Sequence, residues 1–249
     1  MKLAIVMPVF NEVKLVERAL DRIAACPLPR AVDGNPLERF VVIVDDGSVD
    51  GTTEIVKRLA ERTDVRAEFQ SPNRGKGAAV RVGIDRALGL EADIIVIHDA
   101  DLEYDPADHG ALLAPILDGR ADAVIGSRFL GQTHRVLYFW HSLANRTITM
   151  LSNLLTNLNL SDIECCLKAF TRDVALALEL KEDRFGIEPE IIARLANMEI
   201  EEEDKHDRPL RIFEVPVTYA GRTYAEGKKI RWQDGIEAVA VIVKRNLWS

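Results

Sequence analysis

Two aspartates separated by a single residue follow an apolar run in this chain. The run Ile94–Ile97 is followed by His98 and then by Asp99 and Asp101. Such a run, bounded by polar residues, predicts a strand that is buried on both faces of a parallel sheet. Open parallel sheets bind ligands at the carboxyl ends of their strands, where carboxylates can hold a hard divalent cation together with phosphates. The spacing indicates a metal-bound nucleotide or nucleotide-sugar. The alternative is a loop whose acids only cap the next turn.

Acidic residues also follow two other predicted strands. The strand predicted at Leu3–Val9 leads into Glu12, and the strand predicted at Phe40–Val44 leads into Asp45 and Asp46. Like charges in one cleft repel each other, and a bound cation or ribose hydroxyls would compensate them. We therefore expect these strand ends to form a single ligand site.

Composition restricts the class of protein. The chain has 249 residues, of which 47% are apolar, and a formal net charge of −8. This length predicts one large domain with an ordinary core, and the acidic balance argues against a nucleic-acid-binding protein. The three cysteines, two of them adjacent at Cys165 and Cys166, form neither a disulfide framework nor a zinc pattern. A reducing compartment is expected.

Strands and helices are predicted to alternate along the first half. The predicted strands there are Leu3–Val9, Phe40–Val44, Val65–Phe69, Ile94–Ile97 and Ala123–Ile125, with a helix after each of the first four. The second half is predicted to hold helices at about 140–160, 185–198 and 232–248 and a strand at 210–217. The pattern predicts an α/β fold with a mostly parallel twisted sheet, helices on both faces and a smaller α+β half.

Several segments occur in an order that is typical of one enzyme family. They are Pro8-Val9-Phe10-Asn11-Glu12, Asp45-Asp46-Gly47-Ser48-x-Asp50, Asn73-x-Gly75-Lys76-Gly77, Asp99-Ala100-Asp101-Leu102 and Gly126-Ser127-Arg128. With them the chain resembles the family 2 glycosyltransferases of the GT-A fold, in the branch of dolichol-phosphate mannose synthase and the polyprenyl-phosphate glycosyltransferases. Residues 161–170 and 221–229 are similar to bacterial members of that branch, so the resemblance covers nearly the whole chain.

The resemblance implies a GT-A (Rossmann-like) fold and an inverting, metal-dependent reaction. A sugar would pass from a nucleotide-sugar, usually GDP-mannose or UDP-glucose, to a polyprenyl phosphate, with Mg²⁺ or Mn²⁺ as the cofactor. It also implies one catalytic domain over residues 1–249. Residues 1–127 would bind the nucleotide-sugar, 128–231 would form the acceptor half, and 232–249 would form a C-terminal amphipathic helix.

The resemblance assigns roles to the donor-site residues. It implies that the base and ribose pocket is lined by Pro8, Phe10 and Glu12, with Asp46 also contacting the nucleoside, and that the diphosphate and metal are faced by Asp99 and Asp101. The family often has glutamine where this chain has Glu103. A carboxylate there either strengthens metal binding, as a third ligand, or points elsewhere.

Basic residues provide candidate phosphate ligands. Lys76 stands between two glycines in a turn that would let backbone N–H groups approach phosphate, or in a plain helix-start turn. Arg128 carries a guanidinium fork that fits phosphate oxygens. The resemblance makes it a ligand of the acceptor phosphate, with Arg146 as the second candidate. The alternative for both is a surface arginine.

The acceptor decides whether the reaction needs a base. A phosphate is already ionised near neutral pH, since its second pKa is about 6, whereas a hydroxyl acceptor needs a general base. Asp162 or Glu164 could be that base, and we expect Asp162 in the cleft and Glu164 in a structural role. The candidate catalytic residues are Asp99, Asp101, Arg128 and Asp162.

Three alternatives remain for the activity. The same donor chemistry could act on a saccharide or another hydroxyl acceptor. A sugar-phosphate nucleotidyltransferase is disfavoured because such enzymes usually have a glycine-rich loop after the first strand, where this chain has residues 8–12. A non-catalytic nucleotide-sugar sensor is the third. The donor base, the sugar and the oligomeric state stay open.

The expected location is the cytoplasm. Met1 leads straight into a predicted strand without a signal peptide, and no apolar run approaches the roughly 20 residues that cross a bilayer. Attachment to the cytoplasmic membrane face is a further option. The helix that begins near Trp140 and the tail that ends at Trp248 combine an apolar face with aromatic flanks, although each could equally pack on the core.

Overall fold

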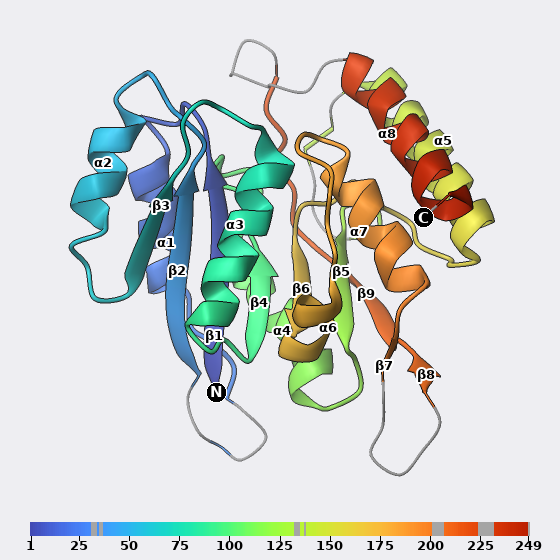
Figure 1. The fold of residues 1–249 in the computed structure, drawn as a ribbon, viewed down its shortest axis with the longest axis horizontal. Coiled ribbons are helices and arrows are strands. Elements are labelled where there is room, and N and C mark those ends of the chain that lie inside the picture. Colours follow the sequence, from blue (N-terminus) through green and yellow to red (C-terminus); the bar gives the residue numbers. More distant parts are fainter. Residues whose placement is uncertain are drawn as a thin grey trace.

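A computed structural model describes residues 1–30, 34, 37–131, 135–136, 138–200, 207–223 and 232–248. A seven-stranded sheet with the order β3-β2-β1-β4-β6-β5-β9 forms the centre of the described chain (Figure 1). The strands of this sheet are β1 (Lys2–Val9), β2 (Glu38–Asp45), β3 (Val65–Phe69), β4 (Ile94–Ile97), β5 (Ala123–Ser127), β6 (Lys168–Thr171) and β9 (Ile212–Pro216). A separate antiparallel pair consists of β7 (Glu199–Ile200) and β8 (Arg208–Pro209).

Helices cover both faces of the sheet (Figure 1). They are α1 (Val16–Ala25), α2 (Thr52–Leu59), α3 (Lys76–Gly89), α4 (His109–Leu117), α5 (Phe139–Thr156), α6 (Arg172–Ala177), α7 (Ile187–Ala196) and α8 (Trp232–Leu247), with a short 3₁₀ turn at Pro106–Asp108. The predicted fold class, a mostly parallel α/β sheet with helices on both faces, is confirmed.

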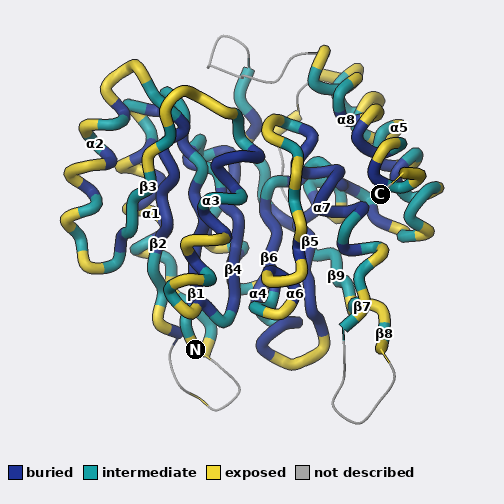
Figure 2. Tube along the Cα trace, in the orientation of Figure 1, coloured by how far each residue is buried: buried dark blue, intermediate teal, exposed yellow. Residues whose placement is uncertain are grey.

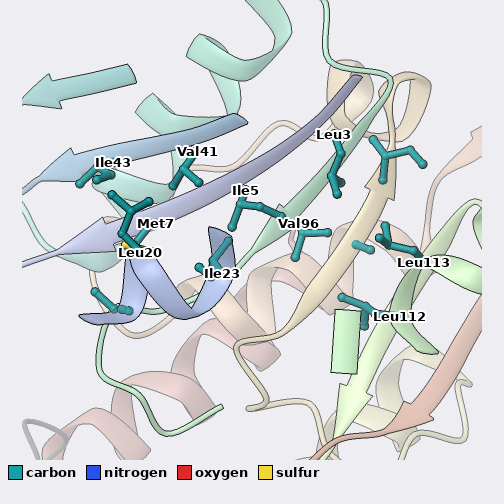
Figure 3. Packing of buried hydrophobic residues seen from close by; sticks show 14 of the residues in the cluster. Leu3, Ile5, Met7, Leu20, Ile23, Val41, Ile43, Val96, Leu112 and Leu113 are labelled. Atoms are coloured by element: carbon teal, nitrogen blue, oxygen red, sulfur yellow. The ribbon is translucent and has the colours of Figure 1, made fainter. Parts of the chain in front are cut away.

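The side-chain alternation of β1 divides the core into two layers. Because successive residues of a strand point to opposite faces, Leu3, Ile5 and Met7 join one apolar cluster with α1, α2 and α4 (Figure 3). Ala4 and Val6 join a second cluster with α3, α6 and α7 on the other face. Both faces of the strand are therefore dry, as the uninterrupted apolar runs of β1, β2 and β4 predict.

The topology brings the site-forming loops to one edge of the sheet. β1, β2 and β4 are parallel, so the loops after Val9, Asp45 and Ile97 leave the same edge. β6 is antiparallel to both β4 and β5, so the loop that precedes Lys168 lies at this edge too. β5 and β9 are parallel, and the loops after Ser127 and Pro216 complete the edge.

β6 and α5 are among the elements that differ from the sequence-based expectation. β6 is a four-residue strand in the middle of the sheet. Its sequence is too short to predict a strand, and the strand forms because these residues pair with β4 and β5. Lys168 in this strand is fully buried, and its ammonium donates to the carbonyl oxygens of Ile163 and Cys165. α5 ends at Thr156, four residues earlier than expected, because Asn157 adopts a left-handed conformation with φ 57°.

The outward faces of α5 and α8 contain many exposed residues (Figure 2). The two helices lie side by side at one end of the molecule (Figure 1). The exposed large apolar residues of α5 and α8 include Phe139, Trp140, Leu143, Met150, Leu154, Ile236, Val239 and Leu247. α8 instead packs inward through Ala238, Val241 and Ile242. Within the ranges that the structure describes, no helix combines the length and apolarity that crossing a membrane requires.

Glycines at the start of α3 allow a second loop to pack on its backbone. A Cβ atom on Gly77 would collide with the carbonyl oxygen of Glu182, and one on Gly75 would meet that of Asp183. The N–H of Ala78 donates to the same Asp183 oxygen at 3.0 Å. The glycines around Lys76 are therefore needed because neighbouring backbone packs closely against them. This reason differs from the sequence-based expectation, in which they let backbone N–H groups approach a phosphate.

Gly77→Ala should destabilise the fold. Since the colliding atom is backbone rather than a flexible side-chain end, we expect a loss of about 1–3 kcal/mol in the free energy of unfolding, measured by urea denaturation. Gly89→Ala in the same helix is the matched control, because a Cβ there meets nothing within 4 Å. That variant should be neutral or stabilised by up to about 1 kcal/mol, and equal losses in both variants would contradict the packing argument.

Candidate active site

Polar contacts join the loops that follow β1 and β2. The N–H of Asn11 donates to Ser48 Oγ at 2.9 Å, and the Asn11 side-chain oxygen accepts from Val49 N at 2.9 Å. The N–H of Glu12 donates to Thr52 Oγ1 at 2.9 Å. These bonds hold the Glu12 carboxylate at the common edge. The predicted nucleoside residues Pro8 and Phe10 lie half-buried beside it, in roles that stay predictions.

Asp46 organises the loop before α3. Its carboxylate accepts from the N–H groups of Arg74 at 2.8 Å and Gly75 at 2.7 Å and from Asn73 Nδ2 at 2.7 Å. Burial raises the pKa of Asp46 although these donors stabilise its charged form. Contact with a nucleoside stays a prediction, and in the structure the Asp46 carboxylate holds this loop in place.

Lys76 joins two acids at the start of α3. Its Nζ lies 2.8 Å from Asp99 Oδ2 and 2.7 Å from Glu188 Oε1, and also 2.9 Å from Cys166 Sγ. Burial alone would lower the pKa of Lys76, but Asp99 and the other two groups raise it well above its ordinary value. Lys76 is therefore a charged ammonium beside the first of the two aspartates.

Asp101 and Glu103 share a cation from a distant segment. The Arg222 guanidinium lies 3.2 Å from Asp101 Oδ2, 3.1 Å from Glu103 Oε1 and 3.3 Å from Glu12 Oε1. Burial, followed by the charges of Asp99 and Glu103, raises the pKa of Asp101 to about 7. Three acids from two strand ends thus meet one guanidinium.

The two aspartates fit a divalent cation. Asp99 Oδ1 is buried, and none of the groups that the structure describes donates to it. Burial, together with repulsion from Asp99 and Glu103, raises the pKa of Asp101, and an added positive charge would relieve that repulsion. Among the described residues, no group of three or more acidic, histidine or cysteine side chains is arranged to hold a metal ion. Asp99 and Asp101 would hold a cation with phosphates completing its shell, while Glu103 as the third ligand stays a prediction.

Arg128 and Asp162 form a buried bidentate pair. Nε of Arg128 lies 2.6 Å from Asp162 Oδ2 and its second nitrogen lies 2.7 Å from Oδ1. Asn145 on α5 accepts from the same guanidinium at 3.1 Å. Burial would raise the pKa of Asp162, but Arg128 lowers it. Asp162 is therefore the ionised partner of Arg128 and a weak proton acceptor.

Arg146 does not join this pair in the structure. It is exposed on α5, where its spacing places it on the same helical face as Leu143 and Met150. Its neighbour Asn145 makes the contact with Arg128 instead. Binding of an acceptor phosphate by Arg146 stays a prediction.

Glu164 is the second carboxyl on the Arg128 side of the site. Burial and the nearby charge of Glu188 raise its pKa to about 7. Its Oε1 atom is buried, and none of the described donors reaches it. We expected Asp162 to be the stronger candidate base and Glu164 to be structural, whereas these environments favour Glu164 as a proton acceptor.

The sequence reasoning missed three contributors. Glu188 enters from the first turn of α7, and its only signal is a pair of acids around Pro189 in an apolar helix. Tyr219 donates to Glu103 Oε2 at 2.7 Å, and its ring lies 5.1 Å from the centre of the Arg128 guanidinium. Asn145 lacks a local signal. Lys228 and Lys229, from the 221–229 stretch, lie outside the described residues.

The comparisons with known proteins identify the family. The model of glycosyl transferase family 2 matches residues 4–178, a range that extends from within β1 to the end of α6 and holds most of the site described above. This chain belongs to glycosyltransferase family 2. It is a glycosyltransferase, and the predicted GT-A fold is confirmed.

Relatives and a solved structure agree with this assignment. The glycosyltransferase AglJ of Haloferax volcanii is 31% identical over 73% of this chain, which spans 54% of that relative's length. The undecaprenyl-phosphate mannosyltransferase of Micrococcus luteus is 27% identical over 97% of this chain and 92% of its own. Glucosyl-3-phosphoglycerate synthase from Mycobacterium tuberculosis shares the fold, with a TM-score of 0.69 and 19% identity over 98% of this chain and 80% of its own.

Glu164→Gln should change how stability depends on pH. The pKa of Glu164 is raised from 4.5 to about 7 on folding, so the unfolded chain ionises first as pH rises. Stability is lost across that window, by about 2 kcal/mol between about pH 5 and pH 8. Glutamine stays neutral, so the variant should lack this loss when unfolding is measured by denaturant at each pH.

Asp162→Asn is the contrasting variant. It leaves the Arg128 guanidinium without its buried partner, and we expect a loss of about 3 kcal/mol that is similar across the same pH window. If Glu164→Gln kept the wild-type pH dependence, the raised pKa of this carboxyl would be wrong.

Proposed function

We propose that this glycosyltransferase moves a sugar from a nucleoside-diphosphate sugar to the phosphate of a polyprenyl phosphate. The reaction inverts the anomeric centre and uses Mg²⁺ or Mn²⁺ at Asp99 and Asp101. The observation that carries the proposal is the juxtaposition of two sites. The Asp99–Lys76 pair and the Arg128 guanidinium lie at the same edge of the sheet, and Tyr219 connects the two, since it donates to Glu103 and its ring lies 5.1 Å from that guanidinium.

The donor half of the proposal rests on the strand-end acids. Asp99 has an oxygen free for a cation, and Asp101 carries a charge that burial and its neighbours make unfavourable. A bound metal ion would act as a Lewis acid on the leaving diphosphate. The Lys76 ammonium adds a second positive charge near that group. The neighbour from Mycobacterium tuberculosis is described in complex with Mn²⁺ and UDP.

The acceptor half rests on Arg128. Asp162 and Asn145 bind its Nε and one terminal nitrogen, so the other terminal nitrogen would donate to the phosphate oxygens. The acceptor phosphate is already ionised, so its oxygen can attack the anomeric carbon without a base. As that bond forms, the bond from carbon to the diphosphate oxygen breaks on the opposite side. The leaving nucleoside diphosphate takes the electron pair, and the configuration inverts.

The names of relatives support the acceptor class. The Micrococcus luteus relative is an undecaprenyl-phosphate mannosyltransferase, and a relative from Methanococcus voltae, 26% identical, is named for transfer to dolichyl phosphate. We extend this chemistry to the present chain. Residues 1–127 would bind the donor, residues 128–231 the acceptor and residues 232–249 would form the C-terminal amphipathic helix of a single catalytic domain.

A hydroxyl acceptor is the second candidate. It would require a residue that accepts a proton near neutral pH, and the raised pKa of Glu164 meets that requirement. This carboxyl, rather than Asp162, would then take the proton of the attacking hydroxyl. The family assignment removes the support for a sugar-phosphate nucleotidyltransferase.

We further propose that the outward faces of α5 and α8 rest on a membrane surface at the cytoplasmic side. α5 carries exposed Trp140, Met150 and Leu154 on one side and Asn145, beside Arg128, on another. A polyprenyl acceptor keeps its hydrocarbon chain in the bilayer, so its phosphate would reach Arg128 from this surface. Apolar faces with aromatic and basic residues bind such interfaces.

Asp101→Asn should abolish most transfer. We expect a loss of about a hundredfold or more in the rate of lipid-linked sugar formation, measured with radiolabelled GDP-mannose or UDP-glucose, undecaprenyl phosphate and Mn²⁺. Asp105→Asn is the matched control, and this variant should keep its activity. Asp105 lies four residues after Asp101 and forms an exposed ion pair with Arg22. Label on an added saccharide, with none on the lipid, would favour the hydroxyl acceptor.

Leu154→Glu should weaken binding to phospholipid vesicles that contain anionic lipid. Leu154 is 78% exposed on α5, so the fold should tolerate the change, while a charge in the interface should lower the bound fraction about tenfold in a sedimentation assay. Leu176→Glu on α6, where the native leucine is 59% exposed, is the control and should bind like the wild type. Equal effects, or no vesicle binding by the wild type, would contradict the membrane proposal.

A further inference from the structure

The segment that follows β9 is fastened along the loop of the acidic motif. Thr218 N donates to Asp108 Oδ2 at 2.7 Å, and Ala220 N donates to the carbonyl oxygen of Glu103 at 2.8 Å. Tyr219 forms an antiparallel bridge with Tyr104. These contacts deliver Arg222 into the donor site.

Both oxygens of Glu103 accept hydrogen bonds from this segment. Its Oε2 accepts from the Tyr219 hydroxyl at 2.7 Å, and its Oε1 accepts from Arg222 N at 2.9 Å and from Arg222 Nε at 3.1 Å. A metal ligand must offer a lone pair in the direction of the ion. The Glu103 oxygens instead point at donors of one neighbouring segment, which differs from Asp99 with its partnerless buried oxygen.

Arg222 pairs with one oxygen of Asp101, the carboxylate that would also hold the cation. One guanidinium nitrogen lies 3.2 Å from Asp101 Oδ2, and the same group reaches Glu12 at 3.3 Å. Its side chain is 15% exposed, and those of the acids it contacts are 9–17% exposed. Two cations in contact with one buried carboxylate oxygen repel each other strongly. A divalent ion and the guanidinium therefore exclude each other at this oxygen.

We propose that Arg222 is the resident counter-cation of the donor site, which competes with the divalent metal ion for Asp101. Glu103 is the positioning residue that holds Arg222 there and is not a metal ligand. The inference rests on the proposed metal-dependent donor site. It assigns a role to Glu103, the carboxylate at a position where the family often has glutamine.

The competition couples the metal to the nucleotide. Without a nucleotide, a metal ion must displace the guanidinium from Asp101, which leaves it paired only with Glu12 and Glu103. A diphosphate brings oxygens that pair well with guanidinium, so nucleotide and metal should each raise the affinity for the other by the same factor. The part of this coupling that is due to Arg222 should vanish when its charge is removed.

The test is Mn²⁺ binding to the chain alone, followed by electron paramagnetic resonance of the free ion. Arg222→Gln should bind Mn²⁺ about tenfold more tightly than the wild type in the absence of nucleotide, and Arg222→Lys should lie between them. Arg58→Gln is the matched control, because Arg58 makes an exposed pair with Glu17 far from the site and its loss changes the net charge equally. Unchanged or weaker binding by a folded Arg222→Gln variant would overturn the competition.

A second pair of variants separates the two roles of the acids. Asp101→Asn should lose Mn²⁺ binding, whereas Glu103→Gln should keep the wild-type affinity or exceed it, since it releases Arg222. Weaker binding by Glu103→Gln would make Glu103 a metal ligand and overturn its positioning role. Circular dichroism and the melting temperature in EDTA establish that each variant is folded.

The same titrations in the presence of GDP or UDP distinguish this inference from the proposed function. If the wild type binds no Mn²⁺ even with nucleotide, the metal-dependent donor site fails and the inference fails with it. If the wild type binds Mn²⁺ with nucleotide but Arg222→Gln leaves both nucleotide-free affinity and coupling unchanged, only the role of Arg222 is wrong.

Discussion

The compensation of negative charge at one edge of the sheet governs the architecture of this glycosyltransferase. Buried or half-buried acids gather there, and in a poorly solvated cleft such charges are unfavourable unless they are paired. Three cations pair them: Lys76, Arg128 and Arg222. Lys76 joins Asp99 to Glu188, Arg222 joins Glu12 to Asp101 and Glu103, and Arg128 pairs with Asp162 from another loop. Their geometry therefore ties together the loops after β1, β4 and β5, the start of α7 and the segment after β9.

Polar side chains that accept backbone N–H groups shape the loops between these ion pairs. Asp46 does so for the loop before α3, and Glu214 on β9 accepts from Ser161 N at 2.8 Å and Asp162 N at 3.1 Å. Buried backbone groups must find partners, and a carboxylate can serve several at once. Some of the carboxylates at this edge of the sheet thus stabilise the loops, while carboxylate oxygens without such contacts are available for ligands.

One helix relates the site to the outer surface. α5 presents Asn145 to the Arg128 guanidinium and exposes Trp140, Met150 and Leu154. Core contacts elsewhere bury apolar residues of α3 and α7 almost completely. The apolar exposure of α5 and α8 therefore stands apart from the remainder of the fold, which is otherwise arranged as two dry layers around one sheet.

The sequence by itself determined the alternating strands and helices, because buried parallel strands carry uninterrupted apolar runs and their helices carry a helical period. It also determined that Asp99, Asp101 and Glu12 share an edge, since parallel strands end on the same side. It did not determine β6, whose four residues become a strand only between β4 and β5.

Only the tertiary structure decided the pairing of charges. Glu188, Tyr219 and Asn145 join the site through contacts between segments far apart in the chain, and local patterns hold no information about such contacts. The environments of Asp162 and Glu164 likewise differ, because Arg128 pairs with the first, whereas burial and the charge of Glu188 raise the pKa of the second to about 7. Residue type determines which chemistry is available, and the distance to the nearest opposite charge, which folding alone creates, decides which residue can perform it.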